Sequence, residues 1–371
     1  MKKFLSKVSV LSVAGMLASG VAFADVNVEV SNENTGFDST NTNDVDIQDS
    51  QDPDADIDVT NSAEIANDVD AASSTGDNSA DENTGGGEID TGNADVDGAL
   101  ENEVNSAAVE LYTEVFGDVD VDAENDTTGA ESTNENFIDV DQELDVTLTN
   151  GASLLNALGV LSASSGGNSA DENTGGGEID TGDAGVSATI INEINAGLGY
   201  EGGFGDVSVD ASNEDTGFDS DNLNDIDIDQ DIDVDVTNSA GVTNDVDSSA
   251  STGDNSADEN TGGGEVLTGN AETWTDISNT VNQGSGYVGG VEFGDVDVDA
   301  ENDTTGAEST NENFIDVDQE LDVTVTNSAG VTNDVDSSAS TGGNSADENT
   351  GGGEIDTGNA SVGISISNTV N

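Results

Sequence analysis

The sequence predicts an all-β protein, an elongated β-solenoid of stacked short strands in four tandem units of about 88 residues. Three observations predict this class. A long segment recurs four times at nearly constant spacing, apolar and acidic residues alternate with a period of two, and the connecting segments are rich in Asn, Thr and Gly. Period-two alternation is typical of strands, and repeated units of this kind bury a continuous core when they stack on their neighbours.

Residues 1–24 have the pattern of a signal peptide. The segment begins with three lysines, continues with an apolar run over 8–21 and ends in Ala22-Phe23-Ala24, which fits a small-x-small cleavage site. The apolar run is too short and too rich in Ser and Gly for a membrane-spanning helix. We therefore expect a secreted protein of the extracellular space or cell surface, which begins at Asp25 and is not inserted in a membrane.

The rest of the chain divides into four repeat units. An Asp-Val-x-Val motif begins each unit, and successive motifs are 93, 88 and 89 residues apart. The predicted units are 25–117, 118–205, 206–294 and 295–371. Residues 117–150 and 294–327 differ only at Leu148 and Val325, which indicates duplication of a two-unit block.

Within the units, a finer spacing indicates strands and turns. Thr followed by Asn or Gly recurs in steps of 15 and 16 residues, as at Thr60, Thr75 and Thr91. The Asn-, Thr- and Gly-rich segments are typical of turns, and they alternate with strand patterns such as the one at 225–236. We expect short strands between these turns, with equivalent Asn and Thr side chains forming ladders along the stack.

A Gly-rich segment, 74–92, returns at 165–182, 251–269 and 340–358. Within it, Gly166-Gly167-Asn168-Ser169-Ala170 and the equivalent Gly342–Ala346 are followed by further amides at Asn173 and Asn349. This arrangement resembles curlin-type repeats of secreted β-solenoid surface proteins. The resemblance implies a stacked solenoid and an extracellular structural role.

The charge distribution excludes most enzyme chemistry. All three basic residues of the chain lie in 1–24, all 81 acidic residues lie after it, and His and Cys are absent. Catalytic triads, Schiff bases, phosphate clamps and zinc sites built on His or Cys are therefore impossible in the mature part. A paired-carboxylate glycosidase remains formally possible, but the acids are spread evenly, and we expect no enzyme.

The same charge defines the expected partners. Nucleic acids and anionic membranes need Lys and Arg for binding, so neither is expected as a partner. Cations in solution, or a basic or surface partner, must supply the counter-charge. Self-association is a further candidate interaction.

Calcium is the candidate cofactor, because it prefers oxygen ligands. Side chains on one face of a strand repeat about every 6.7 Å, and the neighbouring strand lies about 4.8 Å away. The pattern contains no EF-hand loop, because Val234 and Ala240 stand where that loop has Gly and Glu. Defined calcium sites and a diffuse layer of counter-ions are therefore both compatible with the pattern. The candidate metal ligands alternate along one predicted strand: Asp225, Asp227, Asp229, Asp231, Asp233 and Asp235.

Two further features interrupt the repeat. The second unit contains leucines at a helix-compatible spacing, which form either a locally enlarged core or an exposed partner patch: Leu154, Leu155, Leu158 and Leu161. Aromatic residues gather at the unit junctions, where packing and glycan stacking are the alternatives: Tyr112, Tyr200, Trp274 and Tyr287.

These observations predict a secreted, non-enzymatic structural or adhesive protein of the cell surface or extracellular matrix, stabilised by cations. A first alternative is a disordered acidic polyelectrolyte that buffers calcium or controls mineral growth. A second is an ice-binding solenoid, because Thr-x-Thr motifs occur at 147–149 and 324–326.

Overall fold

The computed structural model describes residues 4–12, 26–33, 38–47, 54–105, 109–114, 117–195, 198–283 and 287–370. Strands make up 73% of the structure and none of the described residues is helical. The described part of the chain therefore holds no helix that is long and apolar enough to cross a membrane.

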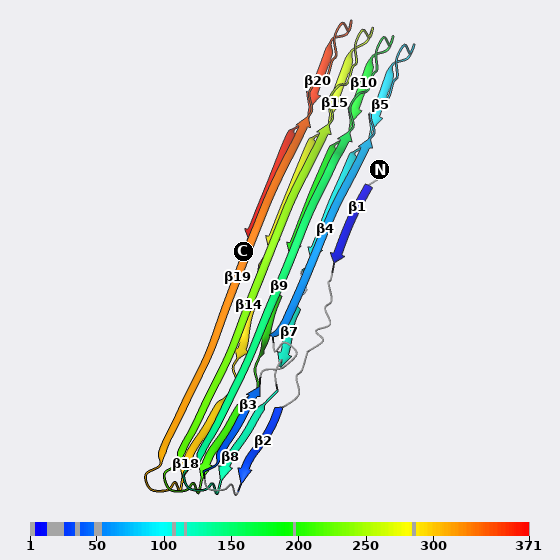
Figure 1. The fold of residues 1–371 in the computed structure, drawn as a ribbon. Coiled ribbons are helices and arrows are strands. Elements are labelled where there is room, and N and C mark those ends of the chain that lie inside the picture. The colour runs from blue at the N-terminus through cyan, green and yellow to red at the C-terminus, as the bar shows by residue number, and fades with distance from the viewer. Residues whose placement is uncertain are drawn as a thin grey trace.

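Each repeat unit forms one coil, and we name these coil 1 to coil 4 after units 1 to 4. The four coils lie side by side in a long, flat stack (Figure 1). The prediction of an all-β solenoid with four units is confirmed.

Coil 2 illustrates the path of the chain. Strand β8 (Val119–Asp126) leads into a turn, and β9 (Thr133–Ser164) then runs along the length of the molecule. The chain reverses in a Gly-rich tip and returns through three strands before coil 3 begins (Figure 1). These strands are β10 (Gly177–Thr181), β11 (Ala184–Ile194) and β12 (Leu198–Gly203).

The other coils repeat this path. Coil 1 contains β2 (Val26–Glu33), β3 (Thr40–Ile47), β4 (Asp54–Ser74), β5 (Gly87–Thr91), β6 (Ala94–Val104) and β7 (Val109–Glu114). Coil 3 contains β13 (Val207–Glu214), β14 (Asp221–Ser251), β15 (Gly264–Thr268), β16 (Ala271–Val281) and β17 (Tyr287–Glu292). Coil 4 contains β18 (Val296–Asp303), β19 (Thr310–Ser340), β20 (Gly353–Thr357) and β21 (Ala360–Val370).

The predicted signal peptide contributes one further strand. Strand β1 (Phe4–Ser12) pairs in parallel with β6 of coil 1. Residues 13–25, which include the predicted cleavage site, lie outside the described residues.

The long strands differ from the short strands that the sequence predicts. Strand β9 has 32 residues and β14 has 31, and the two pair along their whole length with one irregularity. Thr149-Asn150 and Thr237-Asn238 lie inside these strands and do not form turns. The Asn side chains there point inward and are buried, because the alternation of inward and outward residues continues through them.

Two layers of parallel sheet enclose the core. One layer consists of the long strands. The other consists of the return strands and of β2, β8, β13 and β18, the short strands that lead into the turn before each long strand. Val146, Leu148 and Ile232 are among the aliphatic residues between the layers, while the alternate positions carry polar side chains outward. In coil 4 the inward residues of β19 are exposed up to Asn327 and half-buried from Ala329 onward, because in the described structure only coil 3 covers this coil.

Buried amides form ladders through this core, as predicted. The Nδ2 of Asn32 donates to Asn125, Asn125 donates to Asn213, and Asn213 donates to Asn302, over separations of 93, 88 and 89 residues. These separations equal the spacings of the unit starts. Each amide thus satisfies its neighbour in the next coil, which removes much of the cost of burying a polar group.

The Gly-rich tip owes its composition to the close spacing of the coils. A Cβ placed on Gly166 would lie 1.7 Å from the carbonyl oxygen of Gly253, and one on Gly76 would lie 1.6 Å from that of Gly166. No other residue type fits this approach without moving the coils apart. The repeated glycines are therefore a packing requirement of the stack.

Candidate cation-binding surface

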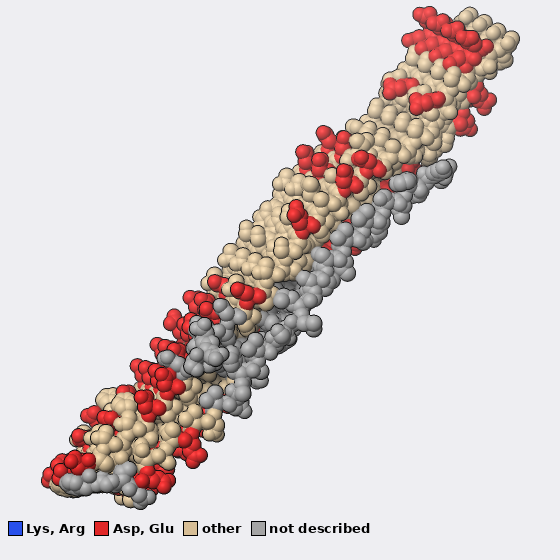
Figure 2. Space-filling view, turned by 45° about the vertical axis from the view of Figure 1, so that its right-hand side comes forward, with Lys and Arg blue, Asp and Glu red and all other residues tan. Residues whose placement is uncertain are grey.

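Strand β14 presents its candidate metal ligands on the outer face of the long-strand layer. Alternate residues from Ile226 to Val236 are buried, so the intervening carboxylates all face outward, as the sequence predicts. The six are Asp225, Asp227, Asp229, Asp231, Asp233 and Asp235. Acidic side chains occur along the length of the face shown in Figure 2, and no Lys or Arg is visible there.

Four of the six carboxylates belong to acidic rows that cross the coils. Asp227 is paired with Asp139 of coil 2 and Asp316 of coil 4, and Asp46 of coil 1 extends this row. Three further rows follow the same pattern: Asp141, Asp229 and Asp318; Glu143, Asp231 and Glu320; Asp145, Asp233 and Asp322. We name these four rows the acidic face.

The two outer members of the predicted set are not in such rows. Asp225 lies between Phe137 and Phe314, and Asp235 lies between Thr147 and Thr324. They therefore lack carboxylate neighbours in the adjoining coils. The sequence of one strand shows its own alternation, but it does not show what the neighbouring coils place beside each residue.

Partial burial and neighbouring charges raise the proton affinity of some carboxylates on the acidic face. Partial burial and the charges of Asp141, Asp318, Asp231 and Asp227 raise the pKa of Asp229 above its ordinary value. Burial and the charges of its acidic neighbours raise the pKa of Asp233 in the same way. Like charges disfavour ionisation, and a cation placed among them would reverse this effect.

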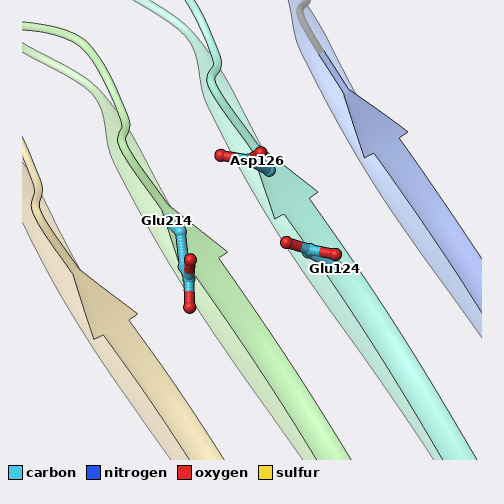
Figure 3. Close-up of side chains that lie close together, drawn as sticks. All are labelled: Glu124, Asp126 and Glu214. Carbon is cyan, nitrogen blue, oxygen red and sulfur yellow. The ribbon is translucent and has the colours of Figure 1, made fainter.

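A second group of carboxylates lies near the turn at the base of coils 2 and 3. One oxygen from each of Glu124, Asp126 and Glu214 lies within 4.8 Å of the other two (Figure 3). Glu124 and Asp126 lie in the last three residues of β8, and Glu214 is the last residue of β13 in the next coil. Burial followed by repulsion from Asp126 raises the pKa of both Glu124 and Glu214.

This cluster offers oxygen ligands of the kind that calcium and magnesium prefer. Three carboxylates provide fewer than the six to eight oxygens of a complete calcium shell unless they bind with both oxygens or water completes the shell. Sequence reasoning did not identify the cluster. An alignment of the units by their start motifs pairs Glu124 with Ser212 and Asp126 with Glu214. This alignment could have predicted the cluster from the sequence.

At the Gly-rich tip, the carboxylates accept hydrogen bonds from the next coil. Asp81 accepts hydrogen bonds from the hydroxyl of Ser169 at 2.6 Å and from the backbone N–H of Asp171 at 2.8 Å, both in coil 2. Burial alone would raise the pKa of Asp81, but these bonds and one from Ser79 lower it below its ordinary value. Asp171 and Asp258 make the same contacts with the following coils. These carboxylates stabilise the stack without a cation.

The candidate leucine patch does not form as a unit. Leu154, Leu158 and Leu161 are buried, and only Leu155 is exposed. The helix-compatible spacing arises from a bulge at Gly159, an extra residue relative to coil 3 that turns both Leu158 and Leu161 inward. Of the two alternatives for these leucines, the exposed patch of four is therefore wrong, and the locally enlarged core agrees with the burial of Leu154, Leu158 and Leu161.

The junction aromatics fall into two groups. Tyr200 is fully buried and packs with Phe204 in the core between the layers, in agreement with a packing role. Trp274 lies on the outer face of β16 and is exposed. The side chains of Tyr112 and Tyr287 lie outside the described residues.

Comparison with known proteins gives no family. No family model matches the chain, and no curated protein and no solved structure is significantly similar to it.

Proposed function

We propose that this chain is a secreted, non-enzymatic structural or adhesive repeat protein of the cell surface or extracellular matrix, stabilised by cations. The observation that carries the proposal is the acidic face, whose rows cross the coils in register without a basic side chain among the described residues after residue 24. Cations, and calcium in particular, take the place of the salt bridges that the mature chain cannot form.

The architecture supports a mechanical role. Each coil is joined to the next by continuous parallel ladders, such as the 31 residues of β14 that pair with β19, and by buried amide ladders. Such a stack resists bending within the plane of its sheets. A divalent ion can coordinate carboxylates of two surfaces at once, so the acidic face suits adhesion to another acidic surface or to a basic partner.

The alternatives receive less support. A disordered polyelectrolyte needs no register between its units, whereas the described residues pair coil by coil in long ladders. An ice-binding face needs neighbouring rows of Thr, but Thr147 and Thr324 are separated by Asp235 in coil 3. Carboxylates recur in every coil, so no single pair is set apart as the acid and base of a glycosidase.

Surface labelling of intact source cells tests the proposed role. An antibody against the tip segment 165–176 should label unbroken cells or their surrounding matrix, and external protease should remove the signal. The mass of the extracted protein should correspond to a chain that begins at Asp25. Antigen that stays inside intact cells with residues 1–24 attached would refute the proposed location and role.

A further inference from the structure

Trp274, the only Trp of the chain, is an exposed apolar residue without a role in the core. Its side chain is 53% exposed, while its neighbours Thr273 and Thr275 are buried. The strand therefore keeps its alternation, with the largest side chain of the chain directed outward. An exposed indole beside carboxylates is a candidate for cation binding, since its ring face attracts positive charge.

A hollow of about 230 Å³ lies beside this indole on the outer face of the return-strand layer. Its floor is coil 2, which has Gly185 and Ser187 there. Each small residue is flanked by larger ones from the adjacent coils, because Gly185 pairs with Asp95 and Glu272, and Ser187 pairs with Asp97 and Trp274. The hollow thus has a wall of two carboxylates on one side and a wall of one carboxylate and the indole on the other. We name it the Trp274 hollow.

The indole is held in place from the opposite side. A Cβ placed on Gly363 of coil 4 would lie 2.3 Å from Cε3 of Trp274 and 2.4 Å from its Cζ3. The six-membered ring therefore rests against the backbone of Gly363, a contact that only glycine permits. An aromatic side chain held in this way loses little conformational entropy when a ligand binds.

We propose that the Trp274 hollow binds an organic ammonium cation on an alkyl stem, either a free quaternary ammonium compound or a lysine side chain of a partner. Indole is the best aromatic partner for such a cation, and the carboxylates of Asp97 and Glu272 add attraction from both walls. A small metal ion gains little from the indole, and anions are repelled. This inference goes beyond the structural role and does not depend on it.

Choline chloride titrated into the full chain tests the proposal, with total ionic strength held constant by NaCl. Trp274 is the only indole, so its fluorescence reports directly on the hollow. We expect a saturable change at millimolar choline, together with an upfield shift of the choline N-methyl protons from the ring current. The neutral isostere 3,3-dimethylbutan-1-ol should produce neither effect. A response that does not saturate, or that equals the response to the isostere, would overturn the proposal.

A second titration identifies the source of the ammonium group. Nα-acetyl-lysine methylamide should also bind if the natural ligand is a lysine side chain of a partner. Saturable binding of choline without binding of the lysine derivative assigns the hollow to free quaternary ammonium compounds. Both results support the proposal, and binding of neither compound contradicts it.

Variants distinguish the hollow from diffuse attraction by the charged surface. Trp274→Leu should weaken choline binding about tenfold in the proton experiment. Ser187→Gln should also weaken it, because the longer side chain fills the floor while it leaves the charge unchanged. Circular dichroism of each variant verifies that the stack is intact.

The matched pair Glu272→Gln and Asp276→Asn completes the test. Both residues are exposed acids on β16, but only Glu272 lines the hollow. Glu272→Gln should reduce the affinity severalfold, whereas Asp276→Asn should leave it nearly unchanged. Equal losses in the two variants would show that choline merely accumulates at an acidic surface and would refute the site.

Discussion

The Nδ2 of Asn156 lies 2.8 Å from the Oδ1 of Asn244, which is 88 residues further along the chain. Both amides are fully buried. Asn156 also accepts hydrogen bonds from Asn67 and Asn102 and donates a second one to Asn192. One side chain therefore joins three coils and both layers of the stack, which makes it a sensitive point for the register of the coils.

Replacement of Asn156 should destabilise the whole stack. Asn156→Ala removes four hydrogen bonds and leaves buried amide groups without a partner, so we expect a loss of about 2 to 5 kcal/mol in the free energy of unfolding. Asn156→Asp should cost at least as much at neutral pH, because it buries a charge that accepts but cannot donate. Urea denaturation followed by circular dichroism measures both losses.

Asn359→Asp provides the matched control, since this residue is exposed in coil 4. It adds the same charge but should change the unfolding free energy by no more than about 0.5 kcal/mol. Equal effects of the two Asp variants would mean that added charge, and not the buried ladder, determines the loss.

The raised pKa values of Asp229 and Asp233 predict a pH dependence. A carboxyl with a raised folded-state pKa binds more protons in the folded chain than in the unfolded chain, so unfolding stability falls as pH rises through the carboxyl range. In low-salt buffer with a chelator, the melting temperature should therefore decrease from about pH 3.5 to pH 6.

The double variant Asp229→Asn/Asp233→Asn should reduce this decrease. Asp81→Asn should act in the opposite direction, because the lowered pKa of Asp81 contributes stability that is present above its unfolded-state pKa and is lost in acid. A melting temperature that increases over the same range in the unmodified chain would contradict the account of the acidic face.

The leucines of coil 2 allow a direct comparison of core and surface. Leu158→Ala should cost about 2 to 5 kcal/mol, because it opens a cavity beside Leu161 and Leu100. Leu155→Thr introduces the residue that coil 3 has at the paired position and should change stability little. Denaturant midpoints measure both, and a large loss from Leu155→Thr would show that this residue has a structural role beyond its exposed position.

The close contact at the tip predicts a strong effect of a single methyl group. Gly166→Ala would place its Cβ 1.7 Å from the oxygen of Gly253, so the coils must separate locally and lose ladder hydrogen bonds. We expect a loss of several kcal/mol, close to that of a disrupted core. Gly241→Ala is the control, because nothing lies within 4 Å of a Cβ at that position in β14. Similar melting temperatures for the two variants would refute the packing role of Gly166.

The repeat spacing and the alternation were sufficient to predict the class, the presence of four repeated units and the amide ladders. Asp225 to Asp235 alternate with aliphatic residues, and this pattern alone places the carboxylates on the outer face. The length of the strands could not be predicted in this way. Asn150 and Asn238 have the composition of a turn, yet both are buried inside long strands. A single sequence does not distinguish an Asn that caps a turn from one such as Asn238, which bonds to its equivalent Asn327 in the next coil.

The candidate sites depended on information that a single strand does not contain. Leu158 and Leu161 are three residues apart, a spacing typical of helices, and a bulge at Gly159 was needed to place both in the core. The cluster of Glu124, Asp126 and Glu214 combines two coils, so it emerges only when the units are aligned. In both cases the deciding contact lies between residues far apart in the sequence.

The claim that cations replace the missing salt bridges is tested most directly by the melting temperature of the full chain at neutral pH in low-salt buffer. A chelator should lower it substantially, and millimolar calcium should restore it more effectively than sodium chloride of equal ionic strength. Equal restoration by sodium would show that the ions only screen the charges and form no defined sites. A melting temperature that is indifferent to chelator, calcium and salt would contradict the account as a whole.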